Sequence, residues 1–358
     1  MTPRERVLTA MRREPPDRVP RELSWGAFTP ALMEIFRQKT GADDPAEYFQ
    51  FEVRAVSLAD TGERPDFSPF LPADLDLGDI TVDQWGVARQ RGTFFHFERM
   101  IHPLRDLQTP RELDAYPFPD PLAPGTHEHL DEAVAQLHAR ELAVAGDLTC
   151  TIFEISWYMR GMEQLLTDLV VNPGFAAALL DRVTEIRKAQ ARRLAQAGVD
   201  ILRLGDDVSS QTGMLMSPAI WRAWLKPRLQ AVIEAARAVN PDLLIFYHSD
   251  GDCRAIVPEL IEIGVDILNP VQPECMDPAE MKRQYGDRLA FWGTIGTQTT
   301  MPFGTPEEVK QVVRERIETV GQGGGLLLAP THILEPDVPW ENVLAFFEAI
   351  EEPHPCTA

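Results

Sequence analysis

The sequence predicts an α/β fold, a (β/α)8 TIM barrel with an N-terminal helical and β-hairpin extension. Apolar strands alternate with amphipathic helices through the C-terminal two-thirds of the chain, which demands parallel pairing because each helix must carry the chain back across the sheet. Polar residues follow the predicted strands, as they do at the mouth of a barrel. The chain has 358 residues, of which 44% are apolar. It can therefore bury one large core, and we expect a single domain over residues 1–358.

Residues 1–140 are expected to form a rim or cap on this barrel. The first twenty residues contain a charged amphipathic helix and then prolines. Arg18 to Leu23 is predicted to be the first barrel strand, and a second strand from this region has no assigned position. Ile80 to Phe97 alternates around Asp83-Gln84 and Arg91-Gly92, a pattern typical of a small antiparallel hairpin.

Six further strands are predicted after residue 140, each followed by polar or glycine-containing loop residues and a helical period. Two of these steps begin alike, at Gly198-Val199-Asp200 and Gly264-Val265-Asp266, where a helix-ending glycine leads into a strand. This echo supports repeated βα units without establishing a duplication. The predicted strands are Leu142 to Gly146, Asp200 to Leu204, Leu243 to His248, Asp266 to Leu268, Leu289 to Gly293 and Leu326 to Ala329.

The composition argues against several classes of partner. The chain has 34 Lys and Arg against 55 Asp and Glu, a formal charge of -21. Such a charge repels phosphate backbones and anionic lipids, so neither nucleic acid nor a membrane surface is an expected partner. No apolar run is long enough for a signal peptide core or a membrane span. The four cysteines are sparse, which suits a reducing compartment. We therefore expect a cytoplasmic protein, and a homodimer is left open.

His248 and Asp250 are the first candidate metal ligands. They end a buried strand and share one side of it because strand side chains alternate with period two. An imidazole and a carboxylate suit zinc or another divalent metal. His332 follows the last predicted strand and so reaches the same face of the barrel. The alternative is that Asp250 caps a helix, while His248 is a satisfied polar group and His332 faces solvent.

Carboxylates after two other strands are candidates for acid–base chemistry. Asp206 and Asp207 follow one strand, and mutual repulsion would raise one pKa, so Asp207 is a candidate general acid or base. The alternative is that one of them faces the pocket while the other caps a loop. Glu154 follows the strand that ends near Asp147 and is a candidate ligand or catalytic carboxylate.

The predicted substrate-binding residues are polar or aromatic groups that follow the strands. Beside Glu154, Trp157 could form a stacking wall, Tyr158 could donate a hydroxyl proton and Arg160 could clamp an anion. The two aromatic side chains could equally belong to the core. Residues after the later strands complete the set, namely Gln272, Trp292 and Gln298.

At these residues the chain resembles the uroporphyrinogen decarboxylase superfamily, whose barrel also serves zinc methyltransferases that shuttle methyl groups between corrinoid proteins and thiols. The resemblance covers nearly the whole length and implies a TIM barrel. The stretches that carry it are Arg4-Glu5-Arg6-Val7, Pro16-Asp17-Arg18-Val19-Pro20, Asp83-Gln84-Trp85-Gly86, His102-Pro103-Leu104, Tyr158-Met159-Arg160-Gly161, Ser217-Pro218, Gly264-Val265-Asp266 and Pro339-Trp340-Glu341-Asn342.

Departures from the family pattern narrow the expected activity. The decarboxylases carry an arginine-rich segment that grips a polycarboxylate, and here the segment reads Arg21-Glu22-Leu23-Ser24-Trp25-Gly26. Tyr158 and His332 still match an active-site tyrosine and histidine of those enzymes. The zinc ligands of the methyltransferases, a histidine and two cysteines, correspond to His248, Asp250 and His332. This harder ligand set favours a metal acting as a Lewis acid or generating hydroxide.

The leading hypothesis is metal-assisted transfer of a methyl or other one-carbon group on a small organic substrate. His248, Asp250 and His332 would hold the metal, while Asp207 or Tyr158 handles protons and Glu154 serves as a catalytic carboxylate or fourth ligand. The resemblance implies zinc and a corrinoid carried by a partner protein. The first rival is metal-free decarboxylation of an organic acid. The second is a non-catalytic barrel that binds a corrinoid, a tetrapyrrole or a partner protein.

Overall fold

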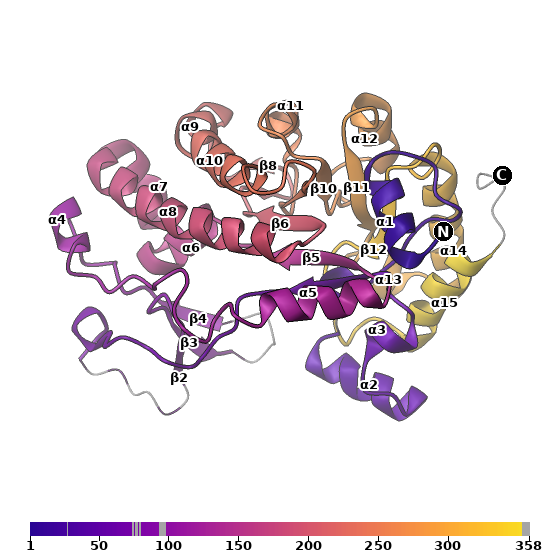
Figure 1. Cartoon of the computed structure of the whole chain (residues 1–358), viewed down its shortest axis with the longest axis horizontal. Helices are drawn as coiled ribbons and strands as arrows, with labels where there is room; N and C mark the ends of the chain where they lie inside the picture. Colours follow the sequence, from indigo (N-terminus) through magenta and orange to yellow (C-terminus); the bar gives the residue numbers. More distant parts are fainter. Residues whose placement is uncertain (27, 74, 76–77, 79, 93–97, 353–358) are drawn as a thin grey trace.

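The computed structural model describes residues 1–358 except 27, 74, 76–77, 79, 93–97 and 353–358. Its centre is a curled parallel sheet of seven strands in the order β1-β5-β6-β9-β10-β11-β12 (Figure 1). The six strands predicted after residue 140 are all present, and the strand without an assigned position is β1. The strands are β1 (Val53–Val56), β5 (Ala143–Asp147), β6 (Ile201–Gly205), β9 (Leu244–His248), β10 (Ile267–Asn269), β11 (Ala290–Ile295) and β12 (Leu326–Pro330).

Helices cover the outer face of this sheet, and most begin where the sequence provides a proline in the first turn or a capping side chain. In α14, for example, Thr305 and Glu308 form a reciprocal capping box. The largest apolar cluster fills the layer between strands and helices. The helices after residue 120 are α5 (Leu130–Ala139), α6 (Phe153–Arg160), α7 (Met162–Val171), α8 (Pro173–Ala197), α9 (Pro218–Trp224), α10 (Lys226–Arg237), α11 (Val257–Glu262), α12 (Pro278–Tyr285), α13 (Thr300–Phe303), α14 (Pro306–Thr319) and α15 (Trp340–Glu351).

The N-terminal helix α1 (Pro3–Met11) closes the amino end of the curled sheet. Its Val7, Ala10 and Met11 are fully buried and belong to a second apolar cluster made with inward-facing strand residues. The Arg4 side chain donates to Asp200 just before β6, and Gly325, just before β12, donates its N–H to the Ala10 carbonyl. The helix therefore lies at the end of the sheet opposite the strands' carboxyl ends.

A buried ion pair lies inside the sheet. Arg203 of β6 and Glu22 are 2% and 3% exposed, and Arg203 Nη2 donates to Glu22 Oε1 at 2.9 Å. Trp292 of β11 donates its indole Nε1–H to the same oxygen, also at 2.9 Å. The guanidinium packs on the Trp292 ring at 4.7 Å. This interior is thus polar at one level, where the Arg203 guanidinium and the Glu22 carboxylate pair with each other.

Residues 18–23, which were predicted to form the first barrel strand, lie beside β12 and so occupy the position of an eighth strand. A single β-bridge joins them to the sheet. Arg21 pairs with Leu328 of β12, where Glu22 N donates to the Leu328 carbonyl at 3.1 Å. Pro20 has no N–H to extend the ladder, and the chain turns into the 3₁₀ segment η1 (Ser24–Gly26), in which Trp25 has a φ of 57°. The prediction of a complete eight-stranded barrel is therefore corrected to a seven-stranded parallel sheet with a bridged eighth segment.

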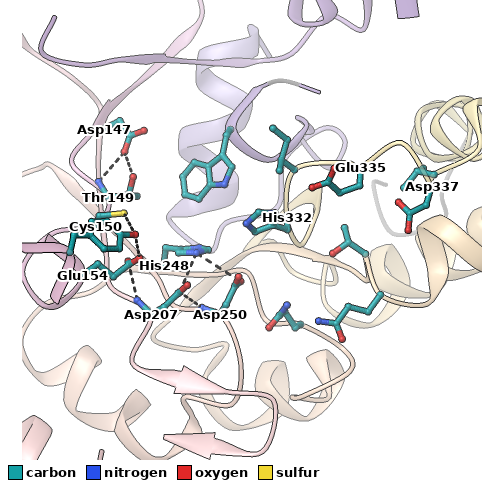
Figure 2. A pocket seen from close by; sticks show the side chains of 17 residues that line it. Asp147, Thr149, Cys150, Glu154, Asp207, His248, Asp250, His332, Glu335 and Asp337 are labelled. Carbon is teal, nitrogen blue, oxygen red and sulfur yellow. Dashed lines mark hydrogen bonds and ion pairs between the residues drawn. The ribbon is translucent and has the colours of Figure 1, made fainter. Parts of the chain in front are cut away.

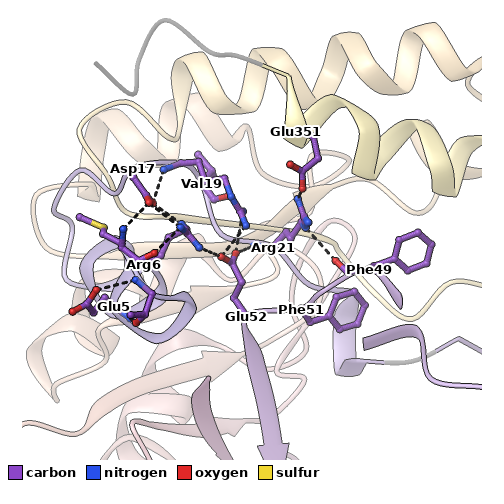
Figure 3. Close-up of polar contacts among 12 residues, drawn as sticks. Glu5, Arg6, Asp17, Val19, Arg21, Phe49, Phe51, Glu52 and Glu351 are labelled. Atoms are coloured by element: carbon purple, nitrogen blue, oxygen red, sulfur yellow. Dashed lines mark hydrogen bonds and ion pairs between the residues drawn. The ribbon is translucent and has the colours of Figure 1, made fainter. Parts of the chain in front are cut away.

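Side chains hold the other side of this segment, next to β1. The Glu52 carboxylate accepts the Arg21 backbone N–H at 3.2 Å and pairs with Arg18 at 3.1 Å and with Arg6 (Figure 3). Arg21 itself pairs with Glu351 of α15. Between β1 and residues 18–21, a carboxylate therefore takes the role that a backbone carbonyl has in a regular ladder.

The remaining part of the N-terminal region forms a three-stranded antiparallel sheet of β2 (Ile80–Val82), β3 (Ala88–Arg91) and β4 (Glu98–Ile101). The predicted hairpin over 80–97 is confirmed in β2 and β3, β4 extends it by one strand, and 93–97 lie outside the described residues. At the turn, Gly86 has a φ of 78°, and a Cβ there would lie 2.2 Å from the Tyr116 hydroxyl. The other short elements are α2 (Pro30–Thr40), α3 (Pro45–Tyr48), η2 (Ser68–Phe70), α4 (Pro110–Leu113), β7 (Ser209–Ser210), β8 (Gly213–Met214) and η3 (Arg254–Ile256).

Among the helices of the described residues, none has the length and apolar character needed to cross a bilayer.

Candidate functional site

A cavity of about 820 Å³ opens at the carboxyl ends of the strands, where a parallel α/β sheet collects its functional groups. It receives Asp147 from β5 and His248 from β9, and loop residues follow the other strands (Figure 2). Most of the residues predicted for the site line this one cavity. They are Glu154, Tyr158, Asp207, His248, Asp250, Gln272, Gln298 and His332.

Three side chains in the cavity lie close enough together to hold a metal ion. One ligand atom each from Asp207, His248 and Asp250 can be chosen so that all lie within 4.8 Å of one another. His248 Nε2 lies 3.5 Å from Asp207 Oδ1 and 3.8 Å from Asp250 Oδ1. His332 lines the same cavity from the loop after β12, outside this group of three (Figure 2). Asp207, which was predicted to transfer protons, thus lies where it could be a metal ligand.

Asn269, at the end of β10, fixes the orientation of the His248 ring. Its amide Nδ2 donates to the Trp292 carbonyl at 2.7 Å, so its Oδ1 faces His248 Nδ1 at 2.6 Å. Because this oxygen can only accept, Nδ1 carries the proton and Nε2 presents its lone pair to the cavity. Burial by itself lowers the pKa of His248. The charges of Asp250 and Asp207, together with the Asn269 hydrogen bond and the charge of Glu154, outweigh burial and raise the pKa above its ordinary value.

Asp250 supplies a buried oxygen that hydrogen bonding leaves unsatisfied. Within the described part of the chain, Asp250 Oδ1 is buried and accepts no hydrogen bond, and burial raises the pKa of this carboxyl. The Asp250 backbone N–H donates to Asp207 Oδ1 at 2.8 Å. A buried, unsatisfied carboxylate oxygen is costly unless a cation meets it. The position of Asp250 Oδ1 beside His248 Nε2 therefore fits a bound metal.

Glu154 and Tyr158 of α6 form a hydrogen-bonded pair at the edge of this group. The Tyr158 hydroxyl donates to Glu154 Oε1 at 2.8 Å, and Glu154 Oε2 accepts the Asp207 N–H at 3.1 Å. Burial, reinforced by the charges of Asp207 and Asp206, raises the pKa of Glu154 to about 8. Burial also raises the pKa of Tyr158. Glu154 can therefore hold a proton at neutral pH within reach of the cavity.

Asp206 does not face the cavity. Its carboxylate accepts the backbone N–H groups of Ile152 and Glu154 at 3.0 and 2.9 Å, at the first turn of α6. Burial raises its pKa to about 6. The two adjacent carboxylates thus have different roles, as in the alternative in which only one of them faces the pocket. Asp207 lies in the cavity, and Asp206 ties α6 to the end of β6.

Three predicted substrate-binding residues do not line the cavity. Arg160 is 1% exposed, pairs with Asp168 at 2.7 Å and donates to the Leu107 carbonyl at 2.7 Å. The Trp292 side chain points inside the sheet toward Glu22, and the Trp157 ring packs edge-on against Tyr158. A role in substrate binding for these three residues is a prediction that the geometry of the cavity does not favour.

Residues that the sequence did not single out complete the cavity. Trp25 packs edge-on against the His248 ring, with ring centroids 5.1 Å apart, and Asp147, Glu335 and Asp337 add carboxylates. Asp147 and Asn269 are the last residues of their strands, and that position could have marked them. Trp25 has no comparable signal, because it arrives from a segment more than 200 residues before His248.

Comparisons with known proteins show the family and the fold of the chain. The sequence model of the uroporphyrinogen decarboxylase (URO-D) family matches residues 72–353. A methylcobamide:CoM methyltransferase from Methanosarcina barkeri is 31% identical over 173 residues, which are 48% of either chain. A uroporphyrinogen decarboxylase from Pelodictyon phaeoclathratiforme is 24% identical over 184 residues, 51% of this chain and 50% of that protein. The chain thus spans about half the length of the curated relatives it matches.

One solved structure shares the fold along the whole chain. A methyltransferase from Methanosarcina mazei superposes with a TM-score of 0.69 over 98% of both chains, at 22% sequence identity.

Proposed function

Because the chain belongs to the uroporphyrinogen decarboxylase family, we propose that it is a metal-dependent enzyme that transfers a methyl or other one-carbon group on a small organic substrate. The family includes both methyltransferases and decarboxylases. The observation that carries the proposal is the group formed by Asp207, His248 and Asp250 at the cavity, with an available imidazole nitrogen and an unsatisfied carboxylate oxygen.

His248 Nε2 and the carboxylate oxygens of Asp207 and Asp250 would hold the metal, and His332 lines the same cavity as a further ligand candidate. Nitrogen and carboxylate donors suit zinc or another divalent ion. When bound, such an ion supplies Lewis-acid chemistry to an electron-rich atom of the substrate. The His248–Asn269 hydrogen bond keeps the ring in the tautomer that can coordinate.

Glu154 and Tyr158 are the proposed proton-transfer residues. With a pKa raised to about 8, Glu154 can keep a proton at Oε1 or Oε2 at neutral pH and give it to a substrate in the cavity. The Tyr158 hydroxyl, whose pKa is raised by burial, keeps its proton and orients Glu154 Oε1. The side chains of this helix thus hold and direct the proton.

A corrinoid carried by a partner protein is the proposed one-carbon carrier, since the names of two relatives include methylcobamide as substrate. Decarboxylation is the second candidate, favoured by the relatives named decarboxylases. It ranks second because, among the described residues, no lysine or arginine lines the cavity to grip a carboxylate substrate.

Metal removal tests the proposed function. The protein, purified without chelator, is expected to contain about one divalent ion per chain by elemental analysis, and a chelator should remove it. Adding zinc back should restore the metal content and raise the melting temperature, because an ion that binds the folded state stabilises it. A protein that neither holds nor regains a divalent ion would contradict the proposal.

Asn269→Leu is expected to weaken metal binding without removing a ligand. The substitution deletes the acceptor of the His248 Nδ1 proton, and loss of such an outer partner typically costs about 10–100-fold in metal affinity. The affinity is measured by competition with a chelating indicator. Asn240→Leu, on a loop outside the cavity, is the matched control and should leave the affinity unchanged. Unchanged affinity in folded Asn269→Leu protein would show that this hydrogen bond does not position the ring.

A further inference from the structure

Gln272, in the loop after β10, presents a hydrogen-bond donor to the cavity. The residue is 5% exposed and lines the cavity. Its Oε1 accepts the Gly251 backbone N–H at 2.6 Å, and the Cys275 thiol sulfur lies 3.8 Å from the same oxygen. Because a backbone N–H can only donate, the side-chain atom that faces Gly251 must be the oxygen. The amide nitrogen Nε2 therefore lies on the side of the amide away from Gly251.

The main chain around this contact is held in place on both sides. The Gln272 carbonyl accepts the backbone N–H groups of Cys275 and Met276 at 2.9 and 2.8 Å. Gly251 has a φ of 80°, and a Cβ there would lie 2.3 Å from the Ser210 carbonyl oxygen, so the loop that carries it packs closely on β7. Nε2 consequently has a defined position, as a group that recognises a ligand requires.

The two N–H groups of Gln272 Nε2 have no acceptor among the described residues. The hydrogen bonds of this side chain are the two at Oε1. Nε2 is also not one of the fully enclosed polar atoms that lack a partner, so it reaches the open space of the cavity. A ligand that displaced water from Nε2 without accepting a hydrogen bond would leave a buried donor unpaired. The donor can therefore discriminate between ligands.

The Gln272 amide is tied to the loop that carries a candidate metal ligand. Gly251 directly follows Asp250, and its hydrogen bond to Gln272 joins that loop to the loop after β10. The amide itself is uncharged. A carboxylate or phosphate would find no counter-charge on Gln272 and would share the cavity with Asp207 and Asp250, whereas an ether, alcohol or carbonyl oxygen needs no counter-charge. The donor therefore fits a neutral oxygen acceptor.

We propose, resting on the function proposed above, that Gln272 determines substrate specificity. The substrate carries a neutral oxygen of the ether, alcohol or carbonyl class in addition to the atom that meets the metal, and Gln272 Nε2 donates a hydrogen bond to that oxygen. A site built in this way rejects an analogue in which carbon replaces the oxygen, because the donor then stays unpaired. Selection by Gln272 requires no charge on the substrate.

Two thiols that differ at one position test this assignment. 2-Methoxyethanethiol has an ether oxygen where 1-butanethiol has a methylene group, and either can place its sulfur on zinc. The protein, with and without zinc, is titrated calorimetrically with each thiol. The measured quantity is the ratio of the two dissociation constants. Gln272→Met should shift this ratio against the ether thiol by about two- to tenfold, which is the contribution of one hydrogen bond.

The ratio separates recognition from structural support. If Gln272 only held Gly251 in place, Gln272→Met would weaken the binding of both thiols alike and leave the ratio unchanged, which would overturn the proposal. Failure of the parent protein to bind the ether thiol would overturn it as well. Gln272→Glu keeps an oxygen for the Gly251 N–H and, when ionised, has no donor, so it should shift the ratio in the same direction. Gln284→Met, at an exposed position of α12 outside the cavity, is the matched control and should keep the parent ratio.

Elemental analysis keeps this outcome separate from the proposed function. A zinc-loaded protein whose ratio does not respond to Gln272→Met supports the metal site and contradicts the role of Gln272. A protein that binds no zinc but whose ratio responds to Gln272→Met contradicts the metal-dependent mechanism and supports recognition of a neutral oxygen.

Discussion

His248→Ala is expected to lower the affinity for a divalent ion more than any other single substitution in the cavity. The change removes the one ligand nitrogen of the three-residue group and leaves Asp207 and Asp250 as unneutralised neighbours. Loss of an outer partner already costs about 10–100-fold, so loss of the ligand itself should exceed 100-fold. The measurement is a competition titration with a chelating indicator, accompanied by elemental analysis of the purified variant.

The matched control for this prediction is another histidine of the same chain. His129 is exposed at the start of α5, lies outside the cavity and makes its hydrogen bond to the Ser57 carbonyl. His129→Ala should keep the full metal content. A folded His248→Ala protein that binds zinc as well as the parent would show that the ligands lie elsewhere, with His332 the next residue to replace.

Arg203→Met should be the most destabilising of the substitutions considered. Glu22 would then be a buried carboxylate without its cation, and breaking a buried pair in this way costs about 3–5 kcal/mol. Burial already raises the pKa of Glu22 and Arg203 opposes that shift, so without Arg203 the carboxyl would take up a proton more readily. The free energy of unfolding is measured by denaturant titration at neutral pH.

Two comparisons show whether the loss comes from the unpaired charge. Adding Glu22→Gln to Arg203→Met removes the charge but keeps an oxygen for the Trp292 indole, and should recover most of the stability. Arg222→Met breaks an ion pair with Glu259 in which the Arg222 side chain is 54% exposed, and should cost less than about 1 kcal/mol. If Arg203→Met cost as little as Arg222→Met, the buried pair would not contribute as described.

The fold was predictable wherever strands were long and apolar. Strands such as Leu244–His248 are buried at every position, and their sequences show it. β1 was missed because Val53–Val56 is only four residues long and Arg54 interrupts its apolar character. The first barrel strand was predicted at residues 18–23. The predicted position is right, because this segment lies beside β12, but the predicted strand is too long, because only one bridge forms. No local sequence pattern reveals that the Glu52 carboxylate takes the place of a backbone acceptor there, since its hydrogen bond with the Arg21 N–H joins residues 31 positions apart.

The site was predictable to the extent that its residues end strands. His248, Asp250 and His332 were identified by that position and line the cavity. Asp207 was given a proton-handling role because the sequence does not show how the loop after β6 bends toward the end of β9. The contact of Asn269 with His248 depends on the pairing of neighbouring strands in the sheet. The position of Trp25 depends on a turn in which this residue has a positive φ. These contacts are set by tertiary packing, which periodicity along one strand does not contain.

The hydrogen bond from the Asp250 backbone N–H to Asp207 has an evolutionary consequence. Every residue except proline carries that donor, so position 250 can exchange its side chain while Asp207 stays in place. The side chain at position 250 could therefore change between a carboxylate and a thiol without rebuilding the neighbouring loop. In the metal site proposed above, the donor atom at this position would then be an easily altered trait, separable from the architecture that supports it.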